Sequence, residues 1–269
     1  MLLESVLLLL AGLAGAFGQV PSPSAPASNF SYISGKGSYL LAIDRTGVVH
    51  RLNGTTWVAL PAPTLVGNPN IPAISTHARS VGASPDGWHH MCTKTGEPFR
   101  FNPNSNTWEY TNNVLCKQIN ARNKDNAAMI KVQALRSNQG VAVTYTATGI
   151  LGTGSWNLLG VTTDNNFDYL EWVSIGKDGE IWTIANEGRV FRYNSAADRF
   201  DGIPILNALR LDVRNASYAT VVTPGCTAWT FKSGTWAKWY IVSGCPVQTT
   251  STSSNDYYLD ERGHFGSRH

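Results

Sequence analysis

A short signature occurs three times in this chain of 269 residues, each time shortly after a glycine that marks a turn. The three copies are His50-Arg51-Leu52-Asn53, Phe99-Arg100-Phe101-Asn102 and Phe191-Arg192-Tyr193-Asn194. The glycines before them are Gly47, Gly96 and Gly188, and the aromatic residues after them are Trp57, Trp108 and Phe200. An earlier turn precedes each copy, at Gly35-Lys36-Gly37, Asp86-Gly87 and Asp178-Gly179. A chain that repeats one unit in this way is predicted to fold as an array of similar elements.

Two weaker copies fit the same frame, with first turns at Gln139-Gly140 and Asn215-Ala216, second turns at Gly149 and Gly225, and later aromatic residues at Trp156 and Trp236. The five turns recur at intervals of roughly 40 to 50 residues, which is the spacing of propeller blades. Residues between the turns alternate as strands do, and two turns plus the outer aromatic segment define four short antiparallel strands. The sequence therefore predicts an all-β fold, a β-propeller of five four-stranded blades, with six as the alternative count.

The two ends of the chain differ in composition from this repeated body. Residues 1–18 are almost continuously apolar but too short to span a bilayer, which is typical of a signal peptide. Residues 19–28 are rich in proline and serine and are predicted to be a linker. The propeller is assigned to residues 29–247, and the Thr- and Ser-rich residues 248–269 to a disordered polar tail. We expect a secreted, extracellular protein with no membrane span after cleavage.

Four cysteines allow three disulfide pairings in an exported chain. We predict the sequential pairing, Cys92 with Cys116 and Cys226 with Cys245, because each closure would then lie inside one repeat. Sequons for N-linked glycans begin at Asn29, Asn53 and Asn215.

The charge pattern limits the classes of partner. The formal net charge is +3, and the charged residues are scattered singly without a basic run, so nucleic acid is not an expected partner. His90 and Cys92 would share one face of a strand beside His89, but this set is too small for a metal site. No Gly-x-Ser-x-Gly elbow or phosphate-binding loop is present, and we expect neither an enzyme nor a cofactor.

Two segments resemble the tectonin-type β-propeller family. One runs from Ser174-Ile175-Gly176-Lys177-Asp178-Gly179-Glu180-Ile181-Trp182 to Gly188-Arg189-Val190-Phe191-Arg192, and the other from Val81-Gly82-Ala83-Ser84-Pro85-Asp86-Gly87 to Phe99-Arg100. Members of this family, which include fish-egg lectins, bind glycans on microbial or egg surfaces, often in innate defence. The resemblance implies a closed propeller that recognises surface or lipopolysaccharide-like glycans. The chain departs from the family pattern in that only Trp182 keeps the tryptophan after the Asp-Gly turn.

Aromatic residues are numerous, with nine Trp and ten Tyr, and such rings can stack on the apolar faces of sugars. Trp57, Trp108 and Trp156 recur at one position of the repeat, so we assign them to packing between blades. The recurrent arginines are likewise assigned to blade structure, paired with a turn aspartate such as Asp86 or Asp178.

The two best-kept repeats carry the predicted glycan site. It consists of loop and strand-end residues near the Asp-Gly turns: Trp88, His90, Arg100, Trp182, Asn186, Glu187 and Arg192. In this hypothesis a sugar stacks on Trp182, and the polar residues hold its hydroxyl groups. The sequence thus predicts a secreted lectin of tectonin type, and the alternative is a secreted structural or matrix propeller that binds protein partners through its faces.

Overall fold

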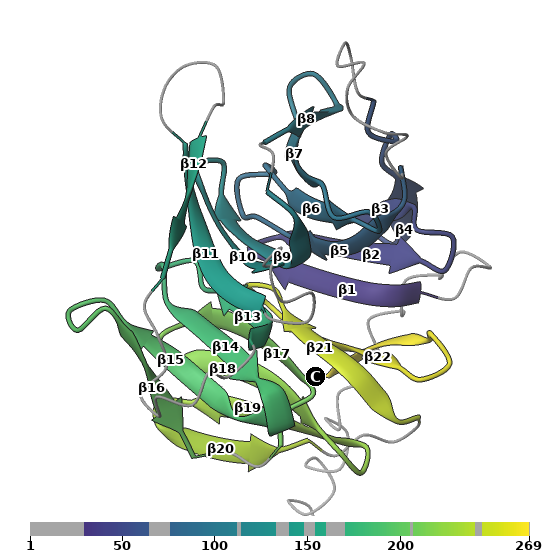
Figure 1. Ribbon diagram of the computed structural model, residues 1–269. Coiled ribbons are helices and arrows are strands. Elements are labelled where there is room, and N and C mark those ends of the chain that lie inside the picture. The colour runs from purple at the N-terminus through teal and green to yellow at the C-terminus, as the bar shows by residue number, and fades with distance from the viewer. Residues whose placement is uncertain are drawn as a thin grey trace, which may run out of the picture.

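The computed structural model describes residues 30–64, 76–111, 114–132, 140–147, 154–159, 170–204, 207–239 and 244–268, and they form six antiparallel sheets around a common axis (Figure 1). Blade 1 consists of β1 (Phe30–Lys36), β2 (Tyr39–Asp44), β3 (Val49–Asn53) and β4 (Thr56–Ala59). Blade 2 consists of β5 (Ala78–Gly82), β6 (His90–Thr93), β7 (Pro98–Asn102) and β8 (Thr107–Tyr110). Blade 3 consists of β9 (Cys116–Asn123), β10 (Asn126–Val132), β11 (Gly140–Ala147) and β12 (Gly154–Leu158).

Blade 4 consists of β13 (Leu170–Ile175), β14 (Ile181–Ala185), β15 (Val190–Asn194) and β16 (Arg199–Ile203), with the short 3-10 helix η1 (Asn186–Gly188) between β14 and β15. Blade 5 consists of β17 (Arg210–Asn215), β18 (Tyr218–Thr223), β19 (Thr227–Lys232) and β20 (Thr235–Lys238). Blade 6 has three strands, β21 (Pro246–Ser251), β22 (Asp256–Asp260) and β23 (Phe265–Arg268). The predicted all-β propeller with five four-stranded blades is confirmed, and a three-stranded sheet completes the ring.

Each blade runs outward from its first strand, so β1, β5, β9, β13, β17 and β21 surround the axis. Consecutive first strands lie next to each other, and β21 contacts both β17 and β1. Figure 1 shows this closure, with the yellow β21 beside the purple β1. Because a first strand has no hydrogen-bonded partner strand on its inner side, the amides on that inner edge need other acceptors.

Polar side chains of the neighbouring blade supply those acceptors at all six junctions. At each junction, one or two amides in or directly after a first strand donate to a side chain on the first strand of the preceding blade. The pairs are Ala83 N to Ser34 Oγ (2.9 Å), Ile119 N to Ser80 Oγ (3.1 Å), Val173 N to Gln118 Oε1 (2.9 Å), Ile175 N to Asn120 Oδ1 (3.4 Å), Val213 N to Ser174 Oγ (2.8 Å), Ser251 N to Asp212 Oδ2 (3.2 Å), Ile33 N to Gln248 Oε1 (3.1 Å) and Gly35 N to Thr250 Oγ1 (2.5 Å). We call these contacts the inner ring.

Apolar side chains from the faces of adjacent blades form the core between them. Trp57 packs on Phe30 of its own blade and on Phe265 of blade 6, and Trp108 donates its indole hydrogen to Pro61 O of the preceding linker at 2.8 Å. The assignment of these two tryptophans to packing between blades is confirmed. Trp156 is half-buried against the cluster around Ile119 and Met129 of its own blade.

Residues 246–268 correct the prediction of a disordered tail from 248 to 269. Their Thr- and Ser-rich part is β21, where Gln248 and Thr250 face blade 1 in the inner ring, so its polar composition serves strand contacts. The turn after β22, which contains Gly263, resembles the second turn of blade 1, which contains Gly47. In both turns an aspartate oxygen accepts backbone amides, Asp44 from Gly47 N at 2.9 Å and Asp260 from Arg262 N at 2.9 Å.

The third repeat was also placed wrongly. Gly140 begins β11, so the segment before it lies between the second and third strands of blade 3 and not between the first and second. Gly149 lies outside the described residues. The short turn at Lys124 and Asp125 is the true first turn of this blade, and it carries no glycine to mark it.

Both predicted disulfides are present, but they join neighbouring blades and do not close loops within one repeat. Cys92 of β6 is bonded to Cys116 at the start of β9, and Cys226 in the β18–β19 turn is bonded to Cys245 just before β21. The first bridge therefore connects blades 2 and 3, and the second connects blades 5 and 6.

The proposed signal peptide, the linker and the sequon at Asn29 lie outside the described residues. Asn53 is exposed at the end of β3, and Asn215 is half-buried at the end of β17. Within the described ranges, no helix has the length and apolarity needed to cross a membrane.

Candidate functional site

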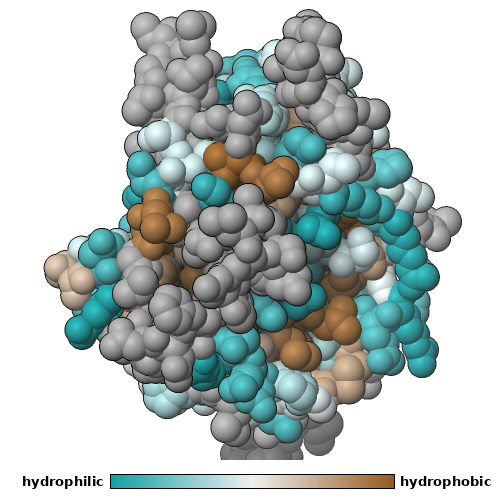
Figure 2. All heavy atoms as spheres, in the orientation of Figure 1, coloured by the Kyte–Doolittle hydropathy of each residue, from teal (hydrophilic) through white to brown (hydrophobic). Residues whose placement is uncertain are grey.

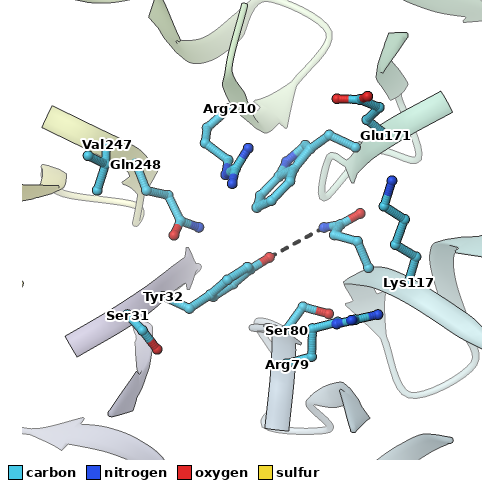
Figure 3. A pocket seen from close by; sticks show the side chains of 11 residues that line it. Ser31, Tyr32, Arg79, Ser80, Lys117, Glu171, Arg210, Val247 and Gln248 are labelled. Carbon is cyan, nitrogen blue, oxygen red and sulfur yellow. Dashed lines mark hydrogen bonds between the residues drawn. The ribbon is translucent and has the colours of Figure 1, made fainter. Parts of the chain in front are cut away.

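The described part of the propeller has a cavity of about 450 Å³ at one end of its axis (Figure 3). The residues around it come from the beginnings of all six first strands: Ser31, Tyr32, Arg79, Ser80, Lys117, Gln118, Glu171, Trp172, Arg210, Val247 and Gln248. We call this opening the channel mouth. It lies at the end of the propeller that carries the turns between second and third strands, because each first strand starts there and runs away from it.

Two stacked aromatic rings form one wall of the channel mouth. The rings of Tyr32 and Trp172 lie 5.6 Å apart between centroids and are inclined by 23°, and the Trp172 indole donates to Leu211 O at 2.7 Å. The Arg210 guanidinium carbon lies 4.6 Å from the centre of the Trp172 ring, within cation–π distance. Trp172 is thereby held by three contacts and forms an apolar side of the cavity.

The floor of the cavity consists of Tyr32, Gln118 and Gln248, all buried. Gln118 Nε2 donates to the Tyr32 hydroxyl oxygen at 3.3 Å, the contact drawn in Figure 3. Burial raises the pKa of the Tyr32 hydroxyl far above its ordinary value, so this group stays protonated.

The charges at the channel mouth are unbalanced. Arg79, Lys117 and Arg210, which we call the mouth cations, are accompanied by one carboxylate, Glu171. Among the described residues no acidic side chain forms an ion pair with any of the three mouth cations. Arg79 and Arg210 are exposed and Lys117 is half-buried, so the mouth presents a net positive charge to solvent.

The far half of the channel is filled by Lys36. Its side chain leaves blade 1 and crosses the axis, and its ammonium donates to Asn120 Oδ1 (2.9 Å) and Ala121 O (3.1 Å) of blade 3 and to Ile175 O of blade 4. Lys36 is 2% exposed, and burial lowers the pKa of its ammonium to about 8, with the Asp212 and Asp178 carboxylates opposing that shift. The deeper residues Ser34, Asn120 and Asp212 are also buried.

Most of the exposed large apolar side chains lie at the same end of the propeller as the channel mouth. Val48 is in the β2–β3 turn, Leu115 and Leu209 immediately precede β9 and β17, and Val247 is the second residue of β21. Leu115 keeps 52% of its side chain exposed. Figure 2 shows exposed apolar side chains as separate groups among hydrophilic ones on the face in view. Scattered exposed aliphatic residues are ordinary, but their concentration at one end marks that end as a candidate contact surface.

The predicted glycan site is not assembled as one site. Trp182 is 0% exposed and packs edge-on against Phe231 and Trp236 of blade 5, and its indole donates to Glu180 Oε1 at 3.0 Å. The prediction that a sugar stacks on Trp182 is therefore wrong, because that ring belongs to the core between blades. The same Glu180 binds Arg192, whose Nη2 lies 3.0 Å from Oε2.

Trp88, His90 and Arg100 lie together in blade 2, but two of the three are buried. His90 is 0% exposed, and burial lowers its pKa to about 3. Arg100 is 3% exposed and bonds Glu109 at 2.7 Å. Trp88 is half-buried, with Arg100 and Lys124 within 4.8 and 4.9 Å of its ring centre.

Asn186 and Glu187 form the turn η1 at the opposite end of blade 4 from the Asp-Gly turn, so they do not join the blade 2 residues. The turn aspartates also have a different role from the predicted one. Asp86 accepts Lys124 N at 2.7 Å and Asp178 accepts Ala216 N at 2.8 Å, each from the following blade. The recurrent Arg100 and Arg192 pair with glutamates instead of these aspartates.

Sequence reasoning missed the channel mouth because its residues are far apart in the chain and belong to no motif. One feature of the sequence could have located it. Polar residues such as Gln118 and Gln248 are buried near the start of a first strand, among largely buried neighbours. Such a residue in a propeller points to the axis side, where it bonds the next blade.

No protein-family model matches the chain, and no curated protein sequence matches it. Solved structures that resemble it are β-propellers. The β-propeller domain of Cps50 (Swd1) from Myceliophteria thermophila matches with a TM-score of 0.59 at 8% identity, over 91% of this chain and 98% of that one. YCF48, solved with a bound peptide, matches with a TM-score of 0.56 at 15% identity, over 88% of this chain and 77% of that one. Human WBSCR16 matches with a TM-score of 0.55 at 9% identity, over 90% and 77% of the two chains. At these identities the likeness establishes the fold alone.

The buried ammonium of Lys36 makes a prediction about pH. Between pH 8 and 10 the folded protein has released the Lys36 proton, whereas the unfolded chain, with a pKa of 10.5, still holds it. Raising the pH through this window therefore favours the folded state. Relative to Lys36→Met, the wild-type free energy of unfolding should rise by up to about 1.4 kcal/mol per pH unit, measured by urea denaturation. Lys177→Met, at an exposed lysine, is the control and should show no such slope. If the difference in unfolding free energy between the wild type and Lys36→Met does not change with pH, the Lys36 ammonium titrates as it does in water.

Proposed function

We propose that this protein is an extracellular, non-enzymatic binding propeller whose ligand is an extended acidic segment of a partner protein, held at the channel mouth. The observation that carries the proposal is the charge of that mouth, where the three mouth cations face one carboxylate. Cations that have no acidic partner within the described protein are available to an acidic ligand, and arginine binds carboxylates through paired hydrogen bonds.

The shape and surroundings of the mouth support a polypeptide ligand. Its volume of about 450 Å³ falls within the range of roughly 300–1,000 Å³ usual for ligand pockets. The Tyr32–Trp172 wall offers apolar contact beside the charges, and Leu115, Leu209 and Val247 extend apolar surface around it. Aromatic and arginine residues are the ones that most often dominate binding energy at protein interfaces.

An extracellular location is part of the proposal. Residues 1–18 have the composition of a signal peptide, and the two disulfides are of the kind that persists in oxidising compartments. The structural likeness to YCF48, which was solved with a bound peptide, adds that a propeller of this form can hold one.

The mouth cations give the direct test. Arg79→Gln/Lys117→Gln/Arg210→Gln should bind acidic peptides about tenfold or more weakly than the wild type on an array of short peptides anchored through their N-termini. The affinity should also fall as salt is raised, because partly exposed charges are screened. Lys232→Gln/Lys238→Gln removes two exposed lysines on the outer strands β19 and β20, which do not line the mouth, and should bind as the wild type does. Equal binding by the triple variant, or no peptide binding by the wild type, would refute the proposal.

Glycan recognition of the tectonin type is the second candidate, and one observation favours it. Trp88 is half-buried, and Arg100 and Lys124 bring hydrogen-bond donors next to its ring. A sugar stacked there should lose about tenfold in affinity with Trp88→Ala, measured on a glycan array followed by calorimetry. The mouth variants should leave that binding unchanged. A wild-type protein that binds no glycan would end this candidate.

A further inference from the structure

We infer that the polypeptide bound at the channel mouth ends there, with its free carboxyl terminus inserted into the cavity. The inference rests on the proposed function and specifies which part of the partner is recognised. It follows from two features of the molecule. The channel is closed beyond its floor, and the groups that face the cavity are suited to an acceptor that carries negative charge.

The channel is closed because its far half is filled with protein. Below the floor, Lys36 crosses from blade 1 to blades 3 and 4, where its ammonium has three oxygen acceptors. The first-strand side chains at that depth, including Asn120, Asp212 and Thr250, are buried and engaged in the inner ring. A pore open at both ends would leave these polar groups in contact with water.

A closed cavity on the axis restricts how a chain can enter it. A segment that lies across a groove keeps both of its ends outside, whereas a cavity with one opening accepts a terminus or a side chain. A terminus can follow the axis of the channel between the six first strands without bending back on itself. Of the two termini, an ammonium would be repelled by Arg79, Lys117 and Arg210, and a carboxylate would be attracted.

The floor offers a hydrogen-bond donor for that carboxylate. The Tyr32 hydroxyl oxygen accepts a hydrogen bond from Gln118 Nε2 at 3.3 Å. No acceptor for the Tyr32 hydroxyl hydrogen occurs among the described residues, although the side chain is more than nine-tenths buried. A carboxylate is an acceptor only, so it can take this hydrogen together with hydrogens of the mouth cations. A carboxamide would direct its own hydrogens at a site that already holds donors.

The test compares matched pairs of peptides. Peptides retained on the N-terminally anchored array are resynthesised with a free carboxyl end and with a carboxamide end, and their affinities are measured by fluorescence polarisation. Amidation should weaken binding by about tenfold or more, because it removes the charge and supplies donors in its place. Tyr32→Phe should weaken the free acid and narrow the difference between acid and amide. Tyr193→Phe, at a hydroxyl that bonds Asp198 on the outer part of blade 4, is its control.

The outcomes separate this inference from the proposed function. Equal binding of acid and amide, with both weakened in the triple mouth variant, would overturn the inference and leave the proposed function in place. Binding of either form that ignores the mouth cations would overturn the proposed function as well. A difference between acid and amide that survives unchanged in Tyr32→Phe would place the carboxylate away from the floor and would contradict the geometry proposed here.

Discussion

The inward edge of each blade is the constraint on which this structure depends. The first strand of a blade exposes amides that no neighbouring strand pairs, and an unpaired buried amide costs free energy comparable to a lost hydrogen bond. The protein meets this with one or two polar side chains per junction, which accept amides of the next blade. The ring of junctions is complete only with blade 6, where Gln248 and Thr250 bond blade 1. Closure therefore depends on the segment that is poorest in apolar residues.

The position of the candidate site follows from the same arrangement. Six first strands begin at one end of the axis, so their initial residues converge although they are far apart in the chain. Deeper in the channel the polar side chains are engaged in the inner ring, and Lys36 occupies the remaining space. At the beginning of the first strands, Arg79, Lys117 and Arg210 can present their side chains to a ligand. The three cations take no part in the inner ring, whereas Ser80, Gln118 and Gln248 both line the mouth and bond the next blade.

Much of the fold was accessible from the sequence because turn glycines and recurring aromatic residues mark blades 1, 2, 4 and 5. Blade 6 was missed because its strand β21 is rich in Thr and Ser, a composition that a disordered tail shares. The candidate site was harder to predict, since exposure is a property of packing. Trp182 lies three residues after Gly179 and is enclosed by blade 5, whereas Trp88 directly follows Gly87 and is only half-buried. The disulfide pairing was predicted correctly from proximity in sequence, although the bonds join blades and do not close them.

Amide hydrogen exchange measured by NMR tests the central claim, that side chains of one blade satisfy the first strand of the next. The relevant amides are those of Ile33, Gly35, Ala83, Ile119, Val173, Ile175, Val213 and Ser251. The account predicts that they exchange as slowly as amides paired inside a blade, and that Ser174→Ala accelerates the Val213 amide before its neighbours. Exchange of these amides as fast as at the outer edge strands β8 and β20 would contradict it.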